Sequence, residues 1–420
     1  MDDLTGILVD LFLLFAAARL AGEIFLRLRQ PAIVGEVLAG VLIGPHALGL
    51  VGVPDSELIN LLGDKQAAEA TLDIVFDVIA GLGVIILLFY VGLETRLDDL
   101  AQVWRRASAV GVLGILFPFA FGFAFIWATG RSNLESAFVA TTLVATSVGI
   151  TARVLSDMGA IRSQEARIIL GAAVLDDILS LLLLAVVKGF AGDDLDVSEV
   201  GFTALAAVVF VVFAALVGTR VVRRYSIHFE RLRLRNAPLL VAIAIMLGFS
   251  ALAGVVGLAA IIGAFLAGMM LAEADERYNL EQQALPLYEL LVPFFFVITG
   301  ARVELDAFAD LEVLGIALAV TSLAILGKVV GGSMAMLGAG RSSALLVGLG
   351  MVPRGEVGLV AASVGAGIGA ISSDIFSVVV FMSIATTLIA PPLLQILLRG
   401  RYRHPAQEPT VLEGRGLPDL

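Results

Sequence analysis

Apolar segments of about 20 residues recur along this chain of 420 residues and constrain its fold more than any other feature. A segment of that length can cross a bilayer as a helix, because a helix satisfies its own backbone polar groups in the absence of water. Hydropathy predicts about thirteen such spans. Their approximate centres are Leu14, Leu42, Val84, Phe117, Ala145, Leu179, Val209, Ala244, Phe265, Phe295, Leu323, Val357 and Ile384. We therefore expect an all-α polytopic membrane protein, since the strands of a membrane barrel alternate and do not give such runs.

The composition supports this class and excludes others. Hydrophobic residues make up 59% of the chain and charged residues 15%, whereas soluble domains average about 45–50% apolar and about 25% charged residues. The absence of cysteine excludes disulfides and thiolate metal sites. A net charge of −11 argues against a basic surface that binds nucleic acid. The acidic start, Met1-Asp2-Asp3, does not resemble a cleavable signal peptide.

Arginines are distributed unequally between alternate loops, and this predicts the orientation of the chain. Loops on one side contain Arg27, Arg29, Arg96, Arg105, Arg106, Arg153, Arg162, Arg167, Arg220, Arg223, Arg224, Arg231, Arg233, Arg235, Arg277, Arg341, Arg399, Arg401 and Arg403. Loops on the other side contain Lys65, Arg131 and Arg302, with Lys188 near a span end. The positive-inside rule places the first set and the C-terminus in the cytoplasm, and the N-terminus outside. Residues 1–403 then form a single transmembrane unit, and residues 404–420 form a short cytoplasmic tail.

Two pairs of short segments predict an internal repeat. The segment 33–40, IVGEVLAG, is similar to the segment 261–268, IIGAFLAG. The segment 91–98, VGLETRLD, is similar to the segment 299–306, TGARVELD. The members of each pair lie an odd number of predicted spans apart, so the two repeats would face opposite ways across the membrane, as in many transporters. The alternative is chance similarity among helices rich in glycine, alanine and leucine.

Two adjacent aspartates, Asp176 and Asp177, lie inside the apolar segment 168–187. A carboxylate at this depth costs at least ~2.5 kcal/mol on insertion scales, and such residues usually bind ions or exchange protons. Adjacent residues on a helix point about 100° apart, so one aspartate can face an aqueous cavity while the other faces a neighbouring helix. We expect one to bind a cation and the other to form an ion pair. A purely structural pair is the alternative.

Lys328 is a further charged residue inside a predicted span. Only three of the 27 basic residues of the chain are lysines. Arginine keeps its proton in proteins, whereas a buried lysine can lose its proton near neutral pH. A cation that titrates opposite an aspartate suits a site that exchanges protons. In the alternative, the Lys328 side chain extends to the cytoplasmic interface of the membrane.

Two predicted spans are interrupted by residues that disfavour a helix. The interruptions are 145–151, with Thr146, Ser147 and Gly149, and 351–358, with Pro353, Gly355, Glu356 and Gly358. Unwound helices expose carbonyl ends and amide ends that carry opposite partial charges. Glu356 suits the amide ends, and a cation suits the carbonyl ends. Two ordinary kinks, with hydroxyl groups that only pack against neighbouring helices, are the alternative.

Four motifs together carry a resemblance to a known family. They are ATSVGITARV at 145–154, ILGAAVLDD at 169–177, GKVVGG at 327–332 and PRGEVG at 353–358. The chain resembles monovalent cation/proton antiporters of the CPA2 group, and most closely bacterial sodium/proton antiporters of the NapA type. The resemblance extends over nearly the whole chain, from Gln30 to the last predicted span.

The resemblance implies an antiporter fold of the NhaA/NapA type, with thirteen spans, inverted repeats and two crossed discontinuous helices. It implies a core domain that includes about 71–192 and 282–400, and a dimerisation domain that includes about 4–51 and 200–275. Asp177 would be the main carrier of cation and proton, and Asp176 would pair with Lys328. The helix crossing would be stabilised by Thr146, Ser147, Pro353, Gly355 and Glu356.

The resemblance also implies a secondary active antiporter, not an enzyme, which exchanges Na⁺ or Li⁺ for H⁺ by alternating access. Such proteins are homodimers in the bacterial inner membrane and need no cofactor, and members with this Asp-Asp pair and lysine typically move two protons per sodium. Potassium/proton antiport or potassium efflux within the same superfamily is the main alternative. An intramembrane aspartyl protease is a remote one, because its aspartates lie on different helices and in a Gly-x-Gly-Asp context that no span here contains. A voltage sensor or channel would need regularly spaced arginines or a filter-like loop.

Overall fold

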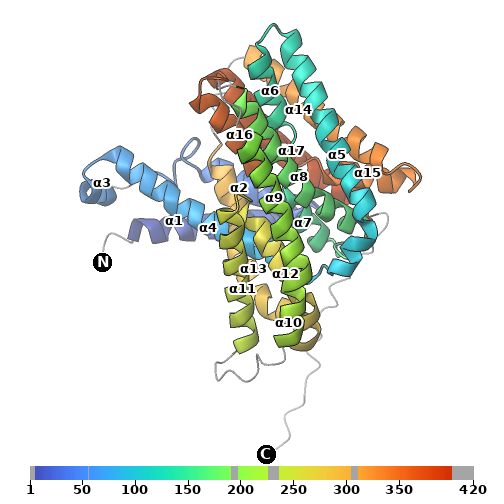
Figure 1. Cartoon of the computed structure of the whole chain (residues 1–420). Helices are drawn as coiled ribbons and strands as arrows, with labels where there is room; N and C mark the ends of the chain where they lie inside the picture. The colour runs from blue at the N-terminus through green and yellow to red at the C-terminus, as the bar shows by residue number, and fades with distance from the viewer. Residues whose placement is uncertain (1–4, 55, 191–196, 226–235, 304–310, 400–420) are drawn as a thin grey trace, which may run out of the picture.

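The computed structural model describes residues 5–54, 56–190, 197–225, 236–303 and 311–399 (Figure 1). All regular elements in these ranges are helices. They are α1 (Thr5–Arg27), α2 (Ala32–Ile43), α3 (Ser56–Leu62), α4 (Lys65–Leu93), α5 (Leu97–Ala128), α6 (Asn133–Thr142), α7 (Val148–Asp157), α8 (Gln164–Gly189), α9 (Val197–Phe213), the π-helix η2 (Ala214–Gly218), α10 (Thr219–Tyr225), α11 (Ala237–Val255), α12 (Ala260–Tyr278), α13 (Leu280–Ala301), α14 (Leu311–Ala335), α15 (Arg341–Gly350), α16 (Glu356–Gly367) and α17 (Ser373–Arg399).

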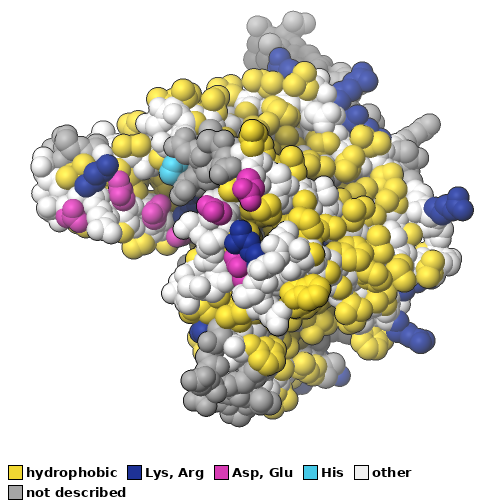
Figure 2. All heavy atoms as spheres, turned by 90° about the horizontal axis from the view of Figure 1, so that it is seen from above, with side chains coloured by type: hydrophobic (Ala, Val, Ile, Leu, Met, Phe, Trp, Pro, Cys, Tyr) yellow, Lys and Arg dark blue, Asp and Glu magenta, His cyan; other side chains and the backbone are white. Residues whose placement is uncertain are grey.

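The helices have the length and surface of a membrane protein. Seven of the described helices, α4, α5, α8, α11, α13, α14 and α17, are long and apolar enough to cross a bilayer, and shorter apolar helices accompany them. Large apolar side chains such as Phe12, Trp104 and Leu116 are more than half exposed. Figure 2 shows hydrophobic side chains over the broad part of one face, with Lys and Arg side chains at its edges. The expected class, an all-helical polytopic membrane protein, is confirmed.

The helices pack into two groups. In the first, α4 packs on α12 and α13, α13 packs on α2, and α1 and α11 pack on α2 and α12 respectively. In the second, α5 packs on α8 and α14, α14 packs on α15 and α17, and α6 packs on α5 and α16. We call α1–α4 with α11–α13 the first bundle, and α5–α8 with α14–α17 the second bundle. In Figure 1, α5, α6 and α14–α16 lie in the upper part of the molecule and α11 and α12 in the lower part.

This packing bears on the boundaries expected for a core domain. The ranges 71–192 and 282–400 include most of α4 and of α13. In the structure, both helices belong to the first bundle, because their most extensive contacts are with each other and with α2 and α12. The division into a core and a dimerisation domain itself stays a prediction.

Glycine permits two close helix crossings inside the first bundle. Gly40 of α2 and Gly300 of α13 face each other's helices, and a Cβ on either would overlap backbone atoms of the other helix. Gly92 of α4 and Gly268 of α12 form a second crossing, where a Cβ on Gly268 would lie 2.8 Å from the Cα of Gly92. Gly40 and Gly268 hold matching positions in one pair of similar sequence segments, and Gly92 and Gly300 hold matching positions in the other. The two crossings are therefore equivalent in sequence as well as in contact.

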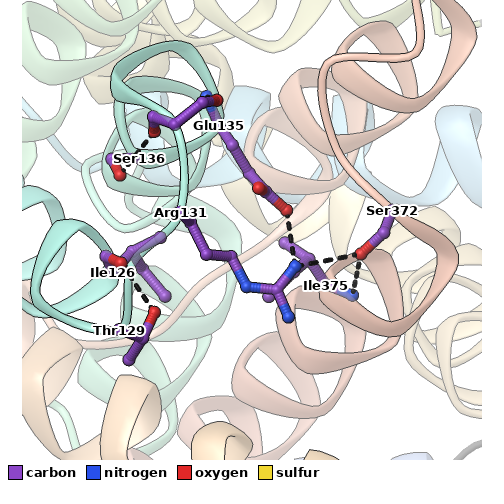
Figure 3. A network of polar contacts seen from close by, with 8 residues as sticks. Ile126, Thr129, Arg131, Glu135, Ser136, Ser372 and Ile375 are labelled. Atoms are coloured by element: carbon purple, nitrogen blue, oxygen red, sulfur yellow. Dashed lines mark hydrogen bonds and ion pairs between the residues drawn. The ribbon is translucent and has the colours of Figure 1, made fainter.

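A network of polar contacts ties two connections of the second bundle together (Figure 3). Arg131 contacts Glu135 Oε1 at 2.8 Å and Ser372 Oγ at 3.4 Å through the same guanidinium nitrogen. The side chain of Ser132 accepts a hydrogen bond from the backbone of Glu135 and begins α6. Because Arg131 precedes α6 and Ser372 precedes α17, the network joins the ends of helices that belong to the same bundle.

Candidate functional site

The two adjacent aspartates lie in the middle of α8. This helix begins where the side chain of Ser163 accepts a hydrogen bond from the backbone of Ala166 at 3.1 Å. Asp176 is 0% exposed and Asp177 is 1% exposed. The helix packs on α5 and also contacts α6, α7, α15 and α16. Both aspartates therefore lie inside the second bundle and do not face the lipid.

Lys328 of α14 reaches Asp176 across the second bundle. Its Nζ donates a hydrogen bond to Asp176 Oδ1 at 2.8 Å, and neither side chain is exposed. The helix α5 passes close to the lysine, since a Cβ on Gly114 would lie 3.6 Å from Nζ. Removing one charge of a buried pair of this kind is costly, because the other charge is then uncompensated unless another ion replaces its partner. The structure thus brings together the aspartate and the lysine that the family resemblance paired.

The two interrupted spans meet at their non-helical segments. Residues 143–147 separate α6 from α7, and residues 351–355 separate α15 from α16. The backbone N–H of Ser147 donates to the carbonyl of Pro353 at 2.7 Å. The hydroxyl of Thr146 donates to another carbonyl of the second segment at 3.1 Å. Four of the residues selected from the sequence for this crossing, Thr146, Ser147, Pro353 and Gly355, therefore lie at one place.

Close contact between these segments requires a glycine. A Cβ on Gly355 would lie 2.9 Å from the Cβ of Ser147, which is too close for two carbon atoms that are not bonded. Glu356 is the first residue of α16, but its side chain lies outside the described part of the chain. Thr151 of α7 is a further member of the crossing, because its hydroxyl donates to the carbonyl of Gly350 at 2.6 Å. In the sequence, only the position of Thr151 among the hydroxyl residues of the first interruption indicates this contact.

Arg354 joins the two interruptions and was given no role from the sequence. Its side chain is fully buried and donates hydrogen bonds to the carbonyls of Val144 at 3.2 Å and Ala145 at 2.8 Å, beyond the C-terminal end of α6. It also donates to the carbonyl of Ala324 in α14 at 3.1 Å, while its own carbonyl accepts from the hydroxyl of Thr387 in α17. The carbonyl end of a helix carries a partial negative charge, which a guanidinium offsets. Arg354 thus places a positive charge of the protein itself beside the carbonyls that follow α6.

A cavity of about 260 Å³ lies between the two bundles. Asp77 and Arg302, an ion pair with an N–O distance of 2.6 Å, lie at its exposed end, and Ser147, Arg354 and Gly355 line it at the crossing. We call the side of the molecule where α4 begins and α13 ends the Arg302 face. The opposite side, where α4 ends and α13 begins, is the Arg162 face. The cavity therefore connects the Arg302 face with the interrupted helices.

Comparison with known proteins shows the family to which this chain belongs. The family model described as sodium/hydrogen exchanger, transmembrane, matches residues 11–400. This chain belongs to the sodium/hydrogen exchanger family. The exchanger is consequently a secondary transporter of the membrane and not an enzyme, and the resemblance drawn from the four motifs is confirmed.

Individual relatives of the exchanger agree with this assignment. The high-affinity Na⁺/H⁺ antiporter NhaS3 of Synechocystis is 39% identical over 97% of this chain and 93% of its own length. The Na⁺/H⁺-K⁺ antiporter GerN of Bacillus cereus is 33% identical over 91% of this chain and 94% of its own. The structure of the sodium proton antiporter MjNhaP1 from Methanocaldococcus jannaschii at pH 8 matches with a TM-score of 0.63 and 19% identity, covering 93% of this chain and 97% of that chain. Because the two sequences are only 19% identical, this structural match supports the fold and no further property.

Within the described part of the exchanger, no three His, Asp or Glu side chains converge as a metal centre would require. The oxygen atoms at the interruptions come instead from hydroxyls such as those of Thr146 and Ser147 and from backbone carbonyls. The helix α8, which carries Asp176 and Asp177, contacts both pairs of interrupted helices. The roles of these groups in transport stay predictions and are argued below.

Proposed function

We propose that this exchanger carries Na⁺, or Li⁺, in exchange for H⁺ by alternating access, with Asp177 as the carboxylate that both ions use. The observation that carries the proposal is the buried pair of Asp176 and Lys328, at 2.8 Å, directly beside Asp177 on α8. Buried charges within membrane helices are costly and usually mark a transport pathway. The nearby meeting of two interrupted helices supports the same conclusion, because such helices form the ion sites of many transporters.

Coupling between the two ions follows from the cost of an empty site. A bare Asp177 carboxylate is unfavourable in a low dielectric, whereas a carboxyl group that is protonated or bound to Na⁺ is not. Only the loaded forms would then change sides, so movement of Na⁺ in one direction requires movement of protons in the other. Oxygen atoms of Asp176 and Asp177, the hydroxyls of Thr146 and Ser147, backbone carbonyls and water would hold the cation, which is the substrate of the protein.

The pair of Asp176 and Lys328 would supply the second proton. In the proton-loaded form, Asp177 is neutral and Lys328 is charged. Arrival of Na⁺ between the two carboxylates would displace the proton of Asp177 and the extra proton of Lys328. Two protons per sodium move one net charge in each cycle, which is worth about 2.3 kcal/mol per 100 mV of membrane potential. The exchange would then be electrogenic.

Potassium is the second candidate cation. The relative GerN is described as a Na⁺/H⁺-K⁺ antiporter, and it is 33% identical to this chain over nearly its whole length. Carboxylate and carbonyl oxygens hold either alkali cation, so the types of residue at the site do not separate the two. Proton movement driven by K⁺, and absent with Na⁺ or Li⁺, would favour this alternative.

We infer an architecture of thirteen crossings with inverted repeats. In this arrangement the first repeat consists of α1, α2, α4, α5, the α6/α7 pair and α8. The second repeat consists, in the same order, of α11, α12, α13, α14, the α15/α16 pair and α17. The helix α9 lies between the two repeats. The equivalence of the Gly40–Gly300 crossing with the Gly268–Gly92 crossing supports this correspondence. The second bundle would move as the core domain against the first. The distribution of arginine would put the Arg162 face in the cytoplasm and the N-terminus outside.

We further propose a homodimer formed through the first bundle. Apolar residues of α1 such as Leu8, Phe12 and Leu20 are more than 60% exposed, and they offer a surface that a second copy or lipid can cover. Chemical crosslinking in membranes should capture dimers. Only monomers after crosslinking would contradict the dimer.

Sodium-driven proton movement in proteoliposomes tests the proposed carrier. Asp177→Asn keeps the size of the side chain and removes its charge, so it should abolish the exchange. Asp374→Asn removes an exposed carboxylate in the first turn of α17 and serves as the matched control, which should retain the exchange. Exchange at the unmodified rate in Asp177→Asn would refute the role of Asp177. Repeating the assay with Na⁺, Li⁺ and K⁺ in turn identifies the cation.

A further inference from the structure

On the Arg162 face, opposite the cavity, a buried ion pair crosses between the two bundles. Nη2 of Arg153, in α7 of the second bundle, lies 4.0 Å from Oε1 of Glu36, in α2 of the first bundle. The guanidinium of Arg153 also lies over the ring of Tyr288 in α13, 5.0 Å from its centroid. Arg153 is 7% exposed and Glu36 is 1% exposed. A second carboxylate, that of Asp157 on α7 itself, holds the same guanidinium at 2.9 Å.

A second ion pair crosses between the bundles nearer the surface. Nη2 of Arg162, which lies between α7 and α8, donates to Oε2 of Glu281, in the first turn of α13, at 3.2 Å. The hydroxyl of Tyr90 in α4 donates to Oε1 of the same carboxylate at 3.2 Å. The ring of Tyr90 lies against the ring of Tyr288, with 4.7 Å between centroids. The two tyrosines therefore connect the buried ion pair with the surface ion pair.

We propose that the Arg153–Glu36 and Arg162–Glu281 pairs form a latch that holds the two bundles together on the Arg162 face. These four residues would be positioning residues for the antiport, because they would set how often that face opens. The inference rests on the proposed alternating access, in which the bundles must separate first on one face and then on the other. In the structure the cavity between the bundles reaches the Arg302 face, so the latch is seen in its closed state.

The buried part of the latch is incompletely bonded, which suits a contact that has to open. Glu36 Oε2, Arg153 Nη1 and Tyr288 Oη are buried and have no hydrogen-bond partner among the described residues. Buried polar atoms without partners cost free energy, and this cost offsets part of the attraction between the charges. Entry of water on opening would satisfy these atoms. The closed and open states would then differ little in free energy.

Cysteine labelling tests the latch without any measurement of transport. The chain contains no cysteine, so Ala80→Cys, in the lining of the cavity, places a single reporter there. A membrane-impermeant maleimide added to the Arg302 face should react with it while the latch is closed. Arg162→Gln and Glu281→Gln should each shift the equilibrium toward the open latch by roughly twofold to fivefold, as expected for a partly exposed ion pair, and so lower the rate of labelling. The exchanged pair, Arg162→Glu with Glu281→Arg, should restore the rate.

A matched control separates the latch from a general effect of charge. Arg131→Gln breaks an ion pair within the second bundle and should leave the rate of labelling unchanged. Unchanged labelling in both Arg162→Gln and Glu281→Gln, or no recovery in the exchanged pair, would overturn the latch. Labelling that follows the expected pattern in a protein that shows no cation-driven proton movement would keep the latch and overturn the proposed function. The two inferences therefore fail in different ways.

Discussion

The buried charges of the exchanger are held in two different ways. Lys328 and Asp176 neutralise each other, whereas Arg354 donates its hydrogen bonds to backbone carbonyls. A pair between Lys328 and one of the two aspartates could be predicted from the sequence, because few charged residues occur within predicted spans and opposite charges in lipid must meet. The choice of Asp176 came from the family resemblance. The partners of Arg354 could not be predicted. They are the backbone carbonyls of Ala145 and Ala324, which belong to two other segments. No residue type in the sequence indicates that these carbonyls accept a side-chain hydrogen bond.

Removal of one partner of the buried pair should destabilise the protein more than removal of both. Lys328→Met leaves Asp176 buried without its cation, and a buried pair broken in this way costs about 3–5 kcal/mol. The double variant Asp176→Asn with Lys328→Met leaves no charge unmatched and should recover most of that loss. Thermal unfolding of the purified proteins in detergent measures the stability of each single variant and of the double variant. If the loss of stability in the double variant equalled the sum of the losses in the two single variants, a direct pairing would be contradicted.

Glu94, at the end of α4 on the Arg162 face, should make stability depend on pH. Burial, and then the charge of Glu281, raise the pKa of Glu94 from 4.5 to about 7, although Arg162 acts in the opposite direction. The folded protein then binds this proton more tightly than the unfolded chain, so stability falls as the pH rises from about 4.5 to about 7 and stays lower above that range. Glu94→Gln should raise the unfolding temperature at pH 8 and leave it unchanged at pH 4.5. An equal change at both pH values would show that ionisation of Glu94 is not the cause.

At the scale of elements, the decisive structures are the two interrupted spans. Their positions could be predicted, because glycine, proline and hydroxyl residues stand out within apolar sequence. The way in which the interruptions are joined could not, because it depends on contacts between segments about 200 residues apart, such as the hydrogen bond from Ser147 to Pro353. The glycine crossings of α2 with α13 and of α4 with α12 likewise place α4 and α13 in the first bundle. Hydropathy alone does not contain that information.

Arg354→Gln should disconnect the interrupted spans. The guanidinium makes charged hydrogen bonds to carbonyls of two segments, and each such bond contributes about 1.5–3 kcal/mol, so we expect a loss of stability of about 3 kcal/mol or more. Cation-driven proton movement should be lost as well, because α6 and α7 would no longer be held against α15 and α16. Arg341→Gln, at the exposed start of α15, is the control and should be neutral. An unfolding temperature equal to that of the unmodified protein would contradict this role for Arg354.

At the scale of the whole molecule, two bundles are separated by a cavity on one face and joined by ion pairs on the other. The hydropathy of the chain predicts its helices, and the paired segments predict that its halves correspond. The face on which the bundles separate depends on contacts between them such as that of Arg162 with Glu281, which lie far apart in the chain. In alternating access, the bundles of this molecule would be held together first on one face and then on the other. Asp177 would carry a proton or a cation each time the site changes sides.

The central claim is that a cation and protons compete for the buried carboxylates of α8, and the number of protons released on cation binding tests it most directly. NaCl added to purified protein in weakly buffered solution should release protons, between one and two for each Na⁺ bound, and a pH electrode or indicator dye records them. Asp177→Asn should bind little Na⁺ and release almost none. Binding of Na⁺ to the unmodified protein without release of any proton would contradict the account.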